Sequence, residues 1–168
     1  AAQYEGVMVQ QYIAGREVAV GIVGDEVLPM SEIDFSAMPA GHWPILSFDA
    51  KWTAGCPEDA GSRPLCPAKL HPALARRIRA AAVGAWRAVR GYGYGRVDLR
   101  VDAKGQPWIL EVNPNPDISD DAGLSRMAQA FGWTYEDLIL RITDLALRAE
   151  RTPVPLDQAE ASLAIRTA

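Results

Sequence analysis

Two short segments near the middle of the chain constrain its fold more than any other part of the sequence. Residues 96–102 alternate apolar and polar side chains, residues 107–113 do so from Leu110 to Asn113, and Ala103-Lys104-Gly105-Gln106 separates the two segments. Alternation with a period of two is typical of half-buried strands, and a short loop that contains glycine commonly joins antiparallel neighbours. The pattern therefore predicts a β-hairpin.

The pairing expected for this hairpin sets Asp98 opposite Glu111 and Arg96 opposite Asn113. Because successive side chains of a strand point to opposite faces, these four polar residues share one face. The other face is predicted to be apolar and to carry Val97, Leu99, Val101, Trp108, Leu110 and Val112.

Two carboxylates that face each other, Asp98 and Glu111, repel and need a positive charge nearby. In one interpretation, Arg96 and Arg100 supply it as a charged ladder. In the other, a divalent cation binds between the carboxylates, because Asp, Glu and Asn oxygens are ligands that Mg²⁺ prefers. Arg96 would then lie beside the metal, where a guanidinium can stabilise a phosphoryl group in transfer. The strand pattern alone leaves both interpretations open.

The rest of the chain is predicted as short strands followed by helices. Gly24-Asp25 is a strong hairpin turn signal, and Gly91–Gly95 is interpreted as a helix stop and connector. The helix at 135–148 begins at Thr134 and Asp137, a relative of the capping box. The expected strands are 7–13, 16–23, 26–35 (one or two pieces interrupted by Pro29) and 45–52; the expected helices are 72–90, 122–131 and 135–148; residues 36–44 and 53–67 are expected to be irregular.

Size and charge exclude several classes of protein. A chain of 168 residues with 49% hydrophobic residues is expected to form one folded domain. Its net charge of −4 provides no overall positive field, so the arginines of residues 76–90 are interpreted as a solvated helix face and no nucleic-acid partner is expected. No segment is apolar enough to suggest a membrane span or a signal peptide.

Two cysteines cannot form a disulfide scaffold, so a cytoplasmic location is expected. A zinc site of Cys56, Cys66 and His71 lacks a fourth ligand, and ordinary loop cysteines are favoured over it. The chain begins Ala1-Ala2 without a methionine, so we expect it to be part of a longer protein.

Several segments, in this order along the chain, resemble ATP-grasp ligases of the D-alanine–D-alanine ligase branch. Arg96-Val97-Asp98 and Glu111-Val112-Asn113-Pro114-Asn115-Pro116 resemble the metal-binding end of that family. Further matches cover most of residues 7–148, namely Gln11–Glu17, Phe48–Trp52, Cys56 through Cys66-Pro67-Ala68, Tyr94–Asp98 and Gly132–Ile139.

The resemblance implies a role for each matching residue. Asp98, Glu111 and Asn113 would hold two Mg²⁺ ions, with Mn²⁺ as the alternative, and Arg96 would act on the transferring phosphoryl group. The nucleotide would be contacted by Gln10, Gln11, Tyr12 and Ile13 at the adenine edge, by Glu17 at the ribose, by Lys51 at the phosphates and by Leu110 near the adenine. Strict alternation sets Leu110 on the face opposite to the metal residues, and the family commonly has Glu where this chain has Gln10.

The resemblance also implies a fold and a reaction. The fold would be α+β, the C-terminal subdomain of an ATP-grasp domain, with a mainly antiparallel sheet and helices packed on one face. Residues 1–151 would form this part, and 152–168 would be a tail, a linker or a short docking helix. ATP would phosphorylate a carboxylate, and an amine would attack the acyl-phosphate. The N-terminal ATP-grasp portion would come from the same chain or from another subunit, so the fragment alone is expected to be inactive.

Two departures from the family concern the acceptor substrate. D-alanine–D-alanine ligases have Gly where this chain has Asp117 and Ser near Ala122. With Asp120 and Asp121, Asp117 makes the loop acidic, which favours an amine-bearing or cationic acceptor. The alternative to a ligase is a non-catalytic module that binds a nucleotide or another protein.

Overall fold

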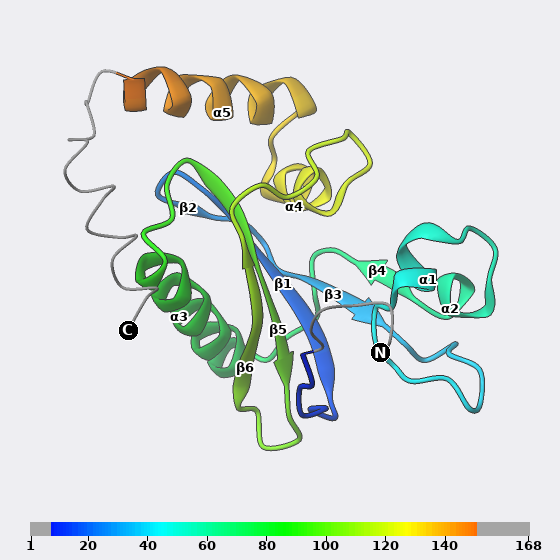
Figure 1. The fold of residues 1–168 in the computed structure, drawn as a ribbon. Helices are drawn as coiled ribbons and strands as arrows, with labels where there is room; N and C mark the ends of the chain where they lie inside the picture. Colours follow the sequence, from blue (N-terminus) through cyan, green and yellow to red (C-terminus); the bar gives the residue numbers. More distant parts are fainter. Residues whose placement is uncertain (1–7, 151–168) are drawn as a thin grey trace.

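One antiparallel sheet organises the protein, and a computed structural model describes residues 8–150 of it (Figure 1). The predicted tail at 152–168 lies outside the described residues. The elements in chain order are β1 (Arg16–Val23), β2 (Glu26–Val27), β3 (Ser31–Asp34), α1 (Phe48–Trp52), α2 (Pro57–Ala60), β4 (Arg63–Leu65), α3 (Pro72–Ala88), β5 (Tyr94–Val101), β6 (Pro107–Asn113), α4 (Gly123–Phe131) and α5 (Tyr135–Glu150).

The sheet has the strand order β4-β3-β1-β5-β6, and β2 pairs with β1 beyond the tight turn at Gly24-Asp25. Every pairing is antiparallel. β1 and β5 are central and pair along their full lengths, from Arg16 opposite Val101 to Val23 opposite Tyr94. The predicted α+β class with an antiparallel sheet is therefore confirmed.

α3 covers one face of this sheet. The helix begins at Pro72, where the fixed φ of proline suits the first turn, and it buries Ile78, Ala82 and Trp86. These side chains pack against alternate residues of the central strands, which include Val20 and Leu99. Figure 1 shows α3 along one side of the strands. The period of 3.6 on the helix and of two on the strands makes this contact predictable from sequence.

The glycines after α3 have a packing role that the sequence did not indicate. A Cβ at Gly91 would meet the indole of Trp86 at 2.2 Å, and one at Gly95 would meet it at 2.3 Å. The ring of Trp86 is therefore packed against bare backbone. The prediction of a helix stop and connector at 91–95 is confirmed at its start, but β5 already begins at Tyr94.

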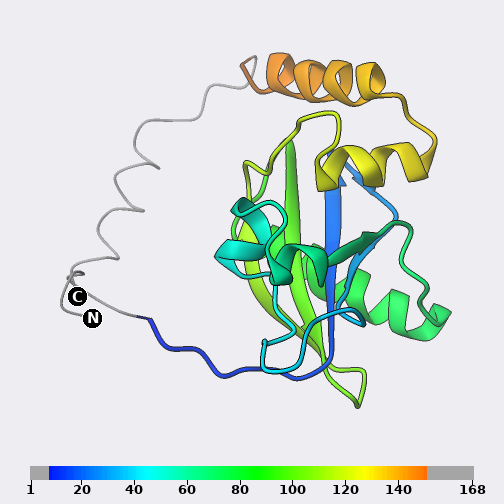
Figure 2. The same ribbon diagram turned by 90° about the vertical axis from the view of Figure 1, so that its right-hand side faces the viewer.

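The opposite face of the sheet is covered at one end by α4 and α5. Leu124, Met127 and Leu138 are buried there against Val23 and Leu28. Figure 2 looks at this side of the sheet, with α4 and α5 toward its upper end and α1 and α2 below them. Helices therefore lie against both faces, whereas the sequence suggested one.

The start of α5 has the predicted capping box. The backbone N–H of Asp137 donates to Thr134 Oγ1 at 3.1 Å, and the N–H of Thr134 donates to the Asp137 carboxylate at 2.9 Å. Each side chain thus satisfies a backbone donor that has no partner within the helix. This local signal is confirmed.

The predicted strand at 45–52 is wrong, because α1 occupies Phe48–Trp52. The signal for a helix was present in Ser47, whose Oγ accepts from the N–H of Ala50 at 3.1 Å and caps the first turn. The apolar residues around this cap resemble a strand because five helical residues are too few to show a period of 3.6. Lys51 therefore lies on a short helix and not at a strand end.

Two other segments also differ from expectation. Residues 8–13 of the strand predicted at 7–13 pair with no strand in the described part of the chain. The irregular stretch 53–67 contains α2, which begins after the N-cap Cys56, and β4, which pairs with β3. Both elements are shorter than five residues, and such lengths leave no periodicity to detect.

The hairpin β5–β6 has the predicted register at one end only. Asp98 pairs with Glu111 and Arg96 with Asn113, as expected. A β-bulge then follows, so that Leu99 pairs with Ile109 and not with Leu110. Strict alternation therefore fails between Glu111 and Ile109, and the prediction that Trp108 lies on the apolar face is wrong, because Trp108 pairs with Arg100.

In the described part of the chain, no helix is both long and apolar enough to cross a membrane.

Candidate functional site

Polar side chains from three strands converge on the sheet face opposite α3. Directly paired residues lie on the same face, so the pairs place side chains of β1, β5 and β6 next to one another. In β1 and β5, Glu17 pairs with Arg100 and Ala19 with Asp98. In β5 and β6, Asp98 pairs with Glu111 and Arg96 with Asn113. We call this set the polar face; it consists of Glu17, Arg96, Asp98, Arg100, Glu111 and Asn113.

Arg96 neutralises the two facing carboxylates. Its Nε donates to Asp98 Oδ1 at 2.7 Å and its NH2 donates to Asp98 Oδ2 at 2.7 Å, a forked contact. The same NH2 lies 3.9 Å from Glu111 Oε1. The hydrogen bonds to Asp98 raise the pKa of the Arg96 guanidinium. The contact between Arg96 and the carboxylates that the ladder interpretation expects is thus present.

The other two oxygen donors are differently engaged. Glu111 is 55% exposed and its closest cationic partner is Arg96. The side-chain oxygen of Asn113 accepts from the N–H of Asn115 at 2.9 Å. Asp98, Glu111 and Asn113 thus present only oxygen donors on neighbouring strand positions, as a hard cation requires. Within residues 8–150, no group of three or more His, Cys, Asp or Glu side chains is placed to hold a metal, so a metal at the polar face would need Asn113 as a third protein ligand.

Arg100 does not join the ladder. It is only 3% exposed, and its NH1 donates to Glu17 Oε2 at 2.8 Å. Other hydrogens of the guanidinium go to backbone carbonyls of Ile13, Gly15 and Pro44. The strand pattern indicated Arg100 only as a partner of Glu111. A signal was available, because an arginine at an inward position of a central strand must find acceptors.

Glu17 lies in a restricted environment beside Arg100. Burial raises the pKa of its carboxyl, although the charge of Arg100 and a hydrogen bond from the backbone of Leu46 oppose this effect. The charge of Asp98 acts in the same direction as burial. Glu17 is therefore close enough to Asp98 for their charges to interact, and Arg100 holds it in place.

The bulge changes the surroundings of Leu110. Trp108 pairs with Arg100, which places the indole on the polar face, and Leu110 lies at the bulge between Ile109 and Glu111. Leu110 is half-exposed and is absent from the hydrophobic cluster under α3, which includes Val112. Because the bulge interrupts the alternation, strict alternation does not place Leu110 on the face of α3.

The remaining predicted residues differ in whether they contact the polar face. Lys51 lies on α1, on the same side of the sheet in Figures 1 and 2, but within residues 8–150 no hydrogen bond or ion pair joins it to the polar face. Gln10 and Gln11 are exposed on the segment before β1. Tyr12 and Ile13 of that segment do contact the polar face, because both accept a hydrogen bond from Arg100.

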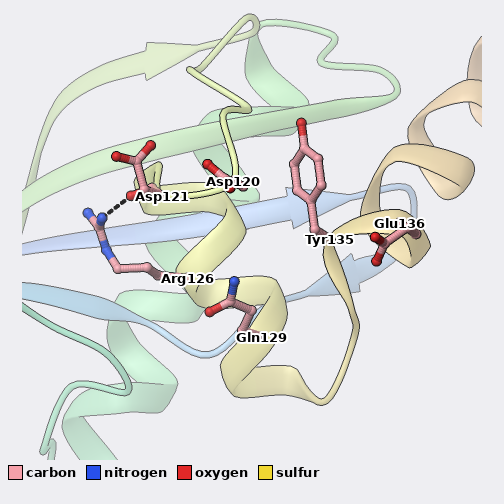
Figure 3. A pocket seen from close by; sticks show the side chains of 6 residues that line it. All are labelled: Asp120, Asp121, Arg126, Gln129, Tyr135 and Glu136. Atoms are coloured by element: carbon pink, nitrogen blue, oxygen red, sulfur yellow. Dashed lines mark hydrogen bonds between the residues drawn. The ribbon is translucent and has the colours of Figure 1, made fainter.

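The acidic loop after β6 divides between two surroundings. Asp117 accepts hydrogen bonds from the N–H and the hydroxyl of Ser119, and these bonds lower the pKa of its carboxyl. The charge of Arg96 lowers this pKa further, by a smaller amount. Asp120 and Asp121 instead line an open hollow of about 530 Å³ (Figure 3). The other residues that line it are Arg126, Gln129, Tyr135 and Glu136. The guanidinium of Arg126 donates to the carbonyl of Asp121.

Neither cysteine belongs to the polar face. The sulfur of Cys56 accepts from the N–H of Asp59 at 3.3 Å and caps α2. Cys66 lies against the backbone of Arg126, and burial raises the pKa of its thiol. His71 caps α3, and His42 contacts Glu58 at 2.8 Å. Each group thus has a local structural partner.

Known proteins are similar to this chain in both sequence and fold. The family model described as "D-ala D-ala ligase C-terminus" matches residues 1–144. D-alanine–D-alanine ligases of Synechococcus sp. (strain JA-2-3B'a(2-13)) and of Gloeobacter violaceus are 36% and 38% identical over 142 and 141 residues. Each alignment covers 84% of this chain but only 41% and 43% of the relative.

A solved structure agrees with the sequence comparison. The D-alanine–D-alanine ligase of Bacillus anthracis complexed with ATP superposes with a TM-score of 0.65 at 25% identity, over 83% of this chain and 40% of that enzyme. The chain thus spans about two fifths of the length of the ligases it matches. It belongs to the D-alanine–D-alanine ligase C-terminal family of the ATP-grasp proteins.

Proposed function

We propose that this chain is the nucleotide- and metal-binding part of an ATP-dependent carboxylate–amine ligase. The observation that carries the proposal is the polar face, on which Asp98, Glu111 and Asn113 lie on adjacent strand positions beside Arg96. The relatives named above are ligases, and one of them was solved with ATP. Because the chain covers about two fifths of those relatives, catalysis requires a further ATP-grasp portion, in the same chain or in another subunit.

Asp98, Glu111 and Asn113 are the residues that would hold two Mg²⁺ ions, or Mn²⁺ in their place. Three protein oxygens leave coordination positions for water and phosphate, which is how Mg²⁺ is usually bound beside a nucleotide. The metal supplies charge neutralisation between the phosphates. Arg96, which makes a forked contact with Asp98, would stand beside such a metal, where its guanidinium could contact the transferring phosphoryl group.

The nucleoside would lie along the other end of the polar face. Glu17 would accept hydrogen bonds from the ribose hydroxyls, and the backbone of Gln10–Ile13 would contact the adenine edge. Leu110 at the bulge would pack near the adenine, which agrees with its position outside the cluster under α3. Lys51 would reach the phosphates from α1. Because ATP is the substrate, we place this protein in the cytoplasm.

The reaction has two steps. A carboxylate oxygen of the first substrate attacks the terminal phosphorus of ATP, and the bond from that phosphorus to the bridging oxygen breaks to give ADP and an acyl-phosphate. The amine nitrogen of the second substrate then attacks the carbonyl carbon, phosphate leaves with the bonding pair, and the nitrogen loses a proton. The part played by Arg96 is to stabilise negative charge that develops on the phosphoryl group.

We propose an amine-bearing or cationic acceptor. Asp117 stands close enough to Arg96 to interact with it electrostatically, and Asp120 and Asp121 follow in the same loop. An acidic loop attracts a cation and repels the free carboxylate of an amino acid. A screen of acceptors with the complete ligase tests this point; D-alanine as the best acceptor would contradict it.

Binding of ADP in the presence of Mn²⁺ tests the proposed function on the chain itself. Isothermal titration calorimetry should detect binding to the wild type, and Asp98→Asn or Glu111→Gln should weaken it about tenfold or more. Even the loss of a group that only hydrogen-bonds a metal ligand typically lowers metal affinity by about tenfold. Glu26→Gln is the matched control, because it removes the same charge at an exposed position of β2. Metal-independent and equal behaviour of all four proteins would favour the non-catalytic interaction module.

A further inference from the structure

The side chain of Arg100 connects three parts of the structure that are far apart in sequence. Its Nε donates to the carbonyl of Ile13 at 2.5 Å, although the two residues are 87 positions apart. Its NH2 donates to the carbonyl of Gly15 at 2.9 Å, and its NH1 donates to the carbonyl of Pro44 at 3.0 Å and to the Glu17 carboxylate at 2.8 Å. A planar guanidinium with five N–H donors can satisfy such a set, whereas a lysine ammonium cannot.

The segment that precedes β1 depends on these contacts. Residues 8–13 pair with no strand in the described part of the chain, and β1 begins only at Arg16. Arg100 also lies 5.0 Å from the ring centroid of Tyr12, which in turn makes an edge contact with Trp43 at 4.9 Å. Arg100 is thus the side chain through which this segment is attached to the central sheet.

The position of Arg100 on β5 fixes a distance within the site. Arg100 and Asp98 are two residues apart on one strand and therefore project from the same face, about 7 Å apart. The segment held by Arg100 is the one that would contact adenine, and Glu17 is the residue that would contact ribose. Asp98 belongs to the metal and phosphate end.

We infer that Arg100 is a positioning residue for the nucleoside: it sets Tyr12 and Ile13 of the adenine-contacting segment and the Glu17 carboxylate at a fixed place relative to the Asp98 end of the polar face. The inference rests on the proposed function. It is supported by energetics, because a buried ion pair contributes little net stability compared with packed apolar side chains. A role in stability alone therefore gives little reason for an arginine at this position.

Two ligands separate this role from a general structural one. ADP carries a nucleoside, whereas inorganic tripolyphosphate offers only a phosphate chain to the metal residues. We expect Arg100→Met to weaken binding of ADP in Mn²⁺ at least tenfold and to leave tripolyphosphate binding within about twofold of the wild type. Arg87→Met is the matched control, because Arg87 is exposed on α3, and it should change neither ligand.

Each result decides the question. An equal loss of both ligands, or a loss of neither, overturns the inference and leaves the proposed function intact. A wild type that binds neither ADP nor tripolyphosphate overturns the proposed function, and the inference with it. Should Arg100→Met fail to fold, as judged by near-ultraviolet circular dichroism, Arg100→Lys decides: it keeps the charge next to Glu17 but loses the forked contacts to the carbonyls, and it should still weaken ADP selectively.

Discussion

Arg96 and Arg100 lie four positions apart on one face of β5, yet they differ in exposure and in the kind of group they bind. The partner of Arg96 is a carboxylate on its own strand, and both side chains retain contact with solvent, at 20% and 17% exposure. Arg100 is 3% exposed, and its partners lie on other segments. The first contact can be exchanged for another cation without moving the backbone. The second holds backbone in place, so its loss must disturb the fold locally.

The difference matters for what each end of the polar face does. A site that binds a metal with phosphate needs ligands that can release one partner and take another. A site that recognises a flat base and a sugar needs a fixed outline, because only a preorganised surface discriminates between shapes. Under the proposed function, the same residue type in two environments on β5 would meet these two requirements.

Removal of Arg100 should have the largest effect on stability. Arg100→Met leaves the partly buried Glu17 carboxylate without its cation and removes the donor from three carbonyls, which should cost about 3 kcal/mol of unfolding free energy, the lower end of the range for a broken buried pair. Urea unfolding of the wild type and of the variant measures this loss. A cost no larger than that of Arg96→Met would remove the contrast between the two arginines.

Removal of Arg96 should cost less and should be partly reversed by metal. Arg96→Met leaves Asp98 and Glu111 facing each other and should lower the unfolding free energy by about 2 kcal/mol. This value lies between those for exposed and for buried ion pairs. Without the competing guanidinium, Asp98 should bind Mn²⁺ more tightly in the absence of nucleotide, and added Mn²⁺ should raise the unfolding midpoint of the variant more than that of the wild type. Equal or weaker Mn²⁺ binding by the variant would show that Arg96 and the metal do not compete.

The cap of α5 provides a reference for a structural effect remote from the polar face. Thr134→Ala removes the acceptor for the N–H of Asp137 and should cost about 1 kcal/mol. Urea unfolding should show this loss, while titration with ADP and Mn²⁺ should show wild-type affinity. A change in affinity would mean that stability and binding are not separable in this protein, and the contrast between the arginines would then need another measure.

The pH dependence at Glu17 should be the smallest effect. Burial raises the pKa of Glu17 above that of an unfolded glutamate, so the folded state binds this proton more tightly than the unfolded state does. Stability from this group therefore falls as pH rises from the ordinary glutamate value, about 4.3, through the raised pKa. The unfolding free energy of the wild type minus that of Glu17→Gln should decrease over this window. An increase would show that Arg100 outweighs burial.

Local patterns in the sequence predicted the elements that have enough residues to show a period. α3, α4, α5 and the hairpin β5–β6 were placed within a few residues, and the capping box at Thr134 was identified. The short elements α1, α2 and β4 were missed, because four or five residues fit a strand, a helix or a turn almost equally well. Residues 8–13 have strand-like composition but pair with no described strand, and composition cannot reveal whether a partner exists.

The sequence by itself determined that Arg96, Asp98, Glu111 and Asn113 share one face, because alternation along two adjacent strands is a local rule. Only the tertiary structure decided that Arg96 binds Asp98 and that Arg100 turns to Ile13, Gly15, Pro44 and Glu17. It also decided the bulge at Leu110, since an extra residue in one strand leaves no mark on the pattern until its neighbour is known. The physical reason is the same in each case: side-chain direction follows from the local backbone, but the choice of a partner depends on segments that only folding brings together.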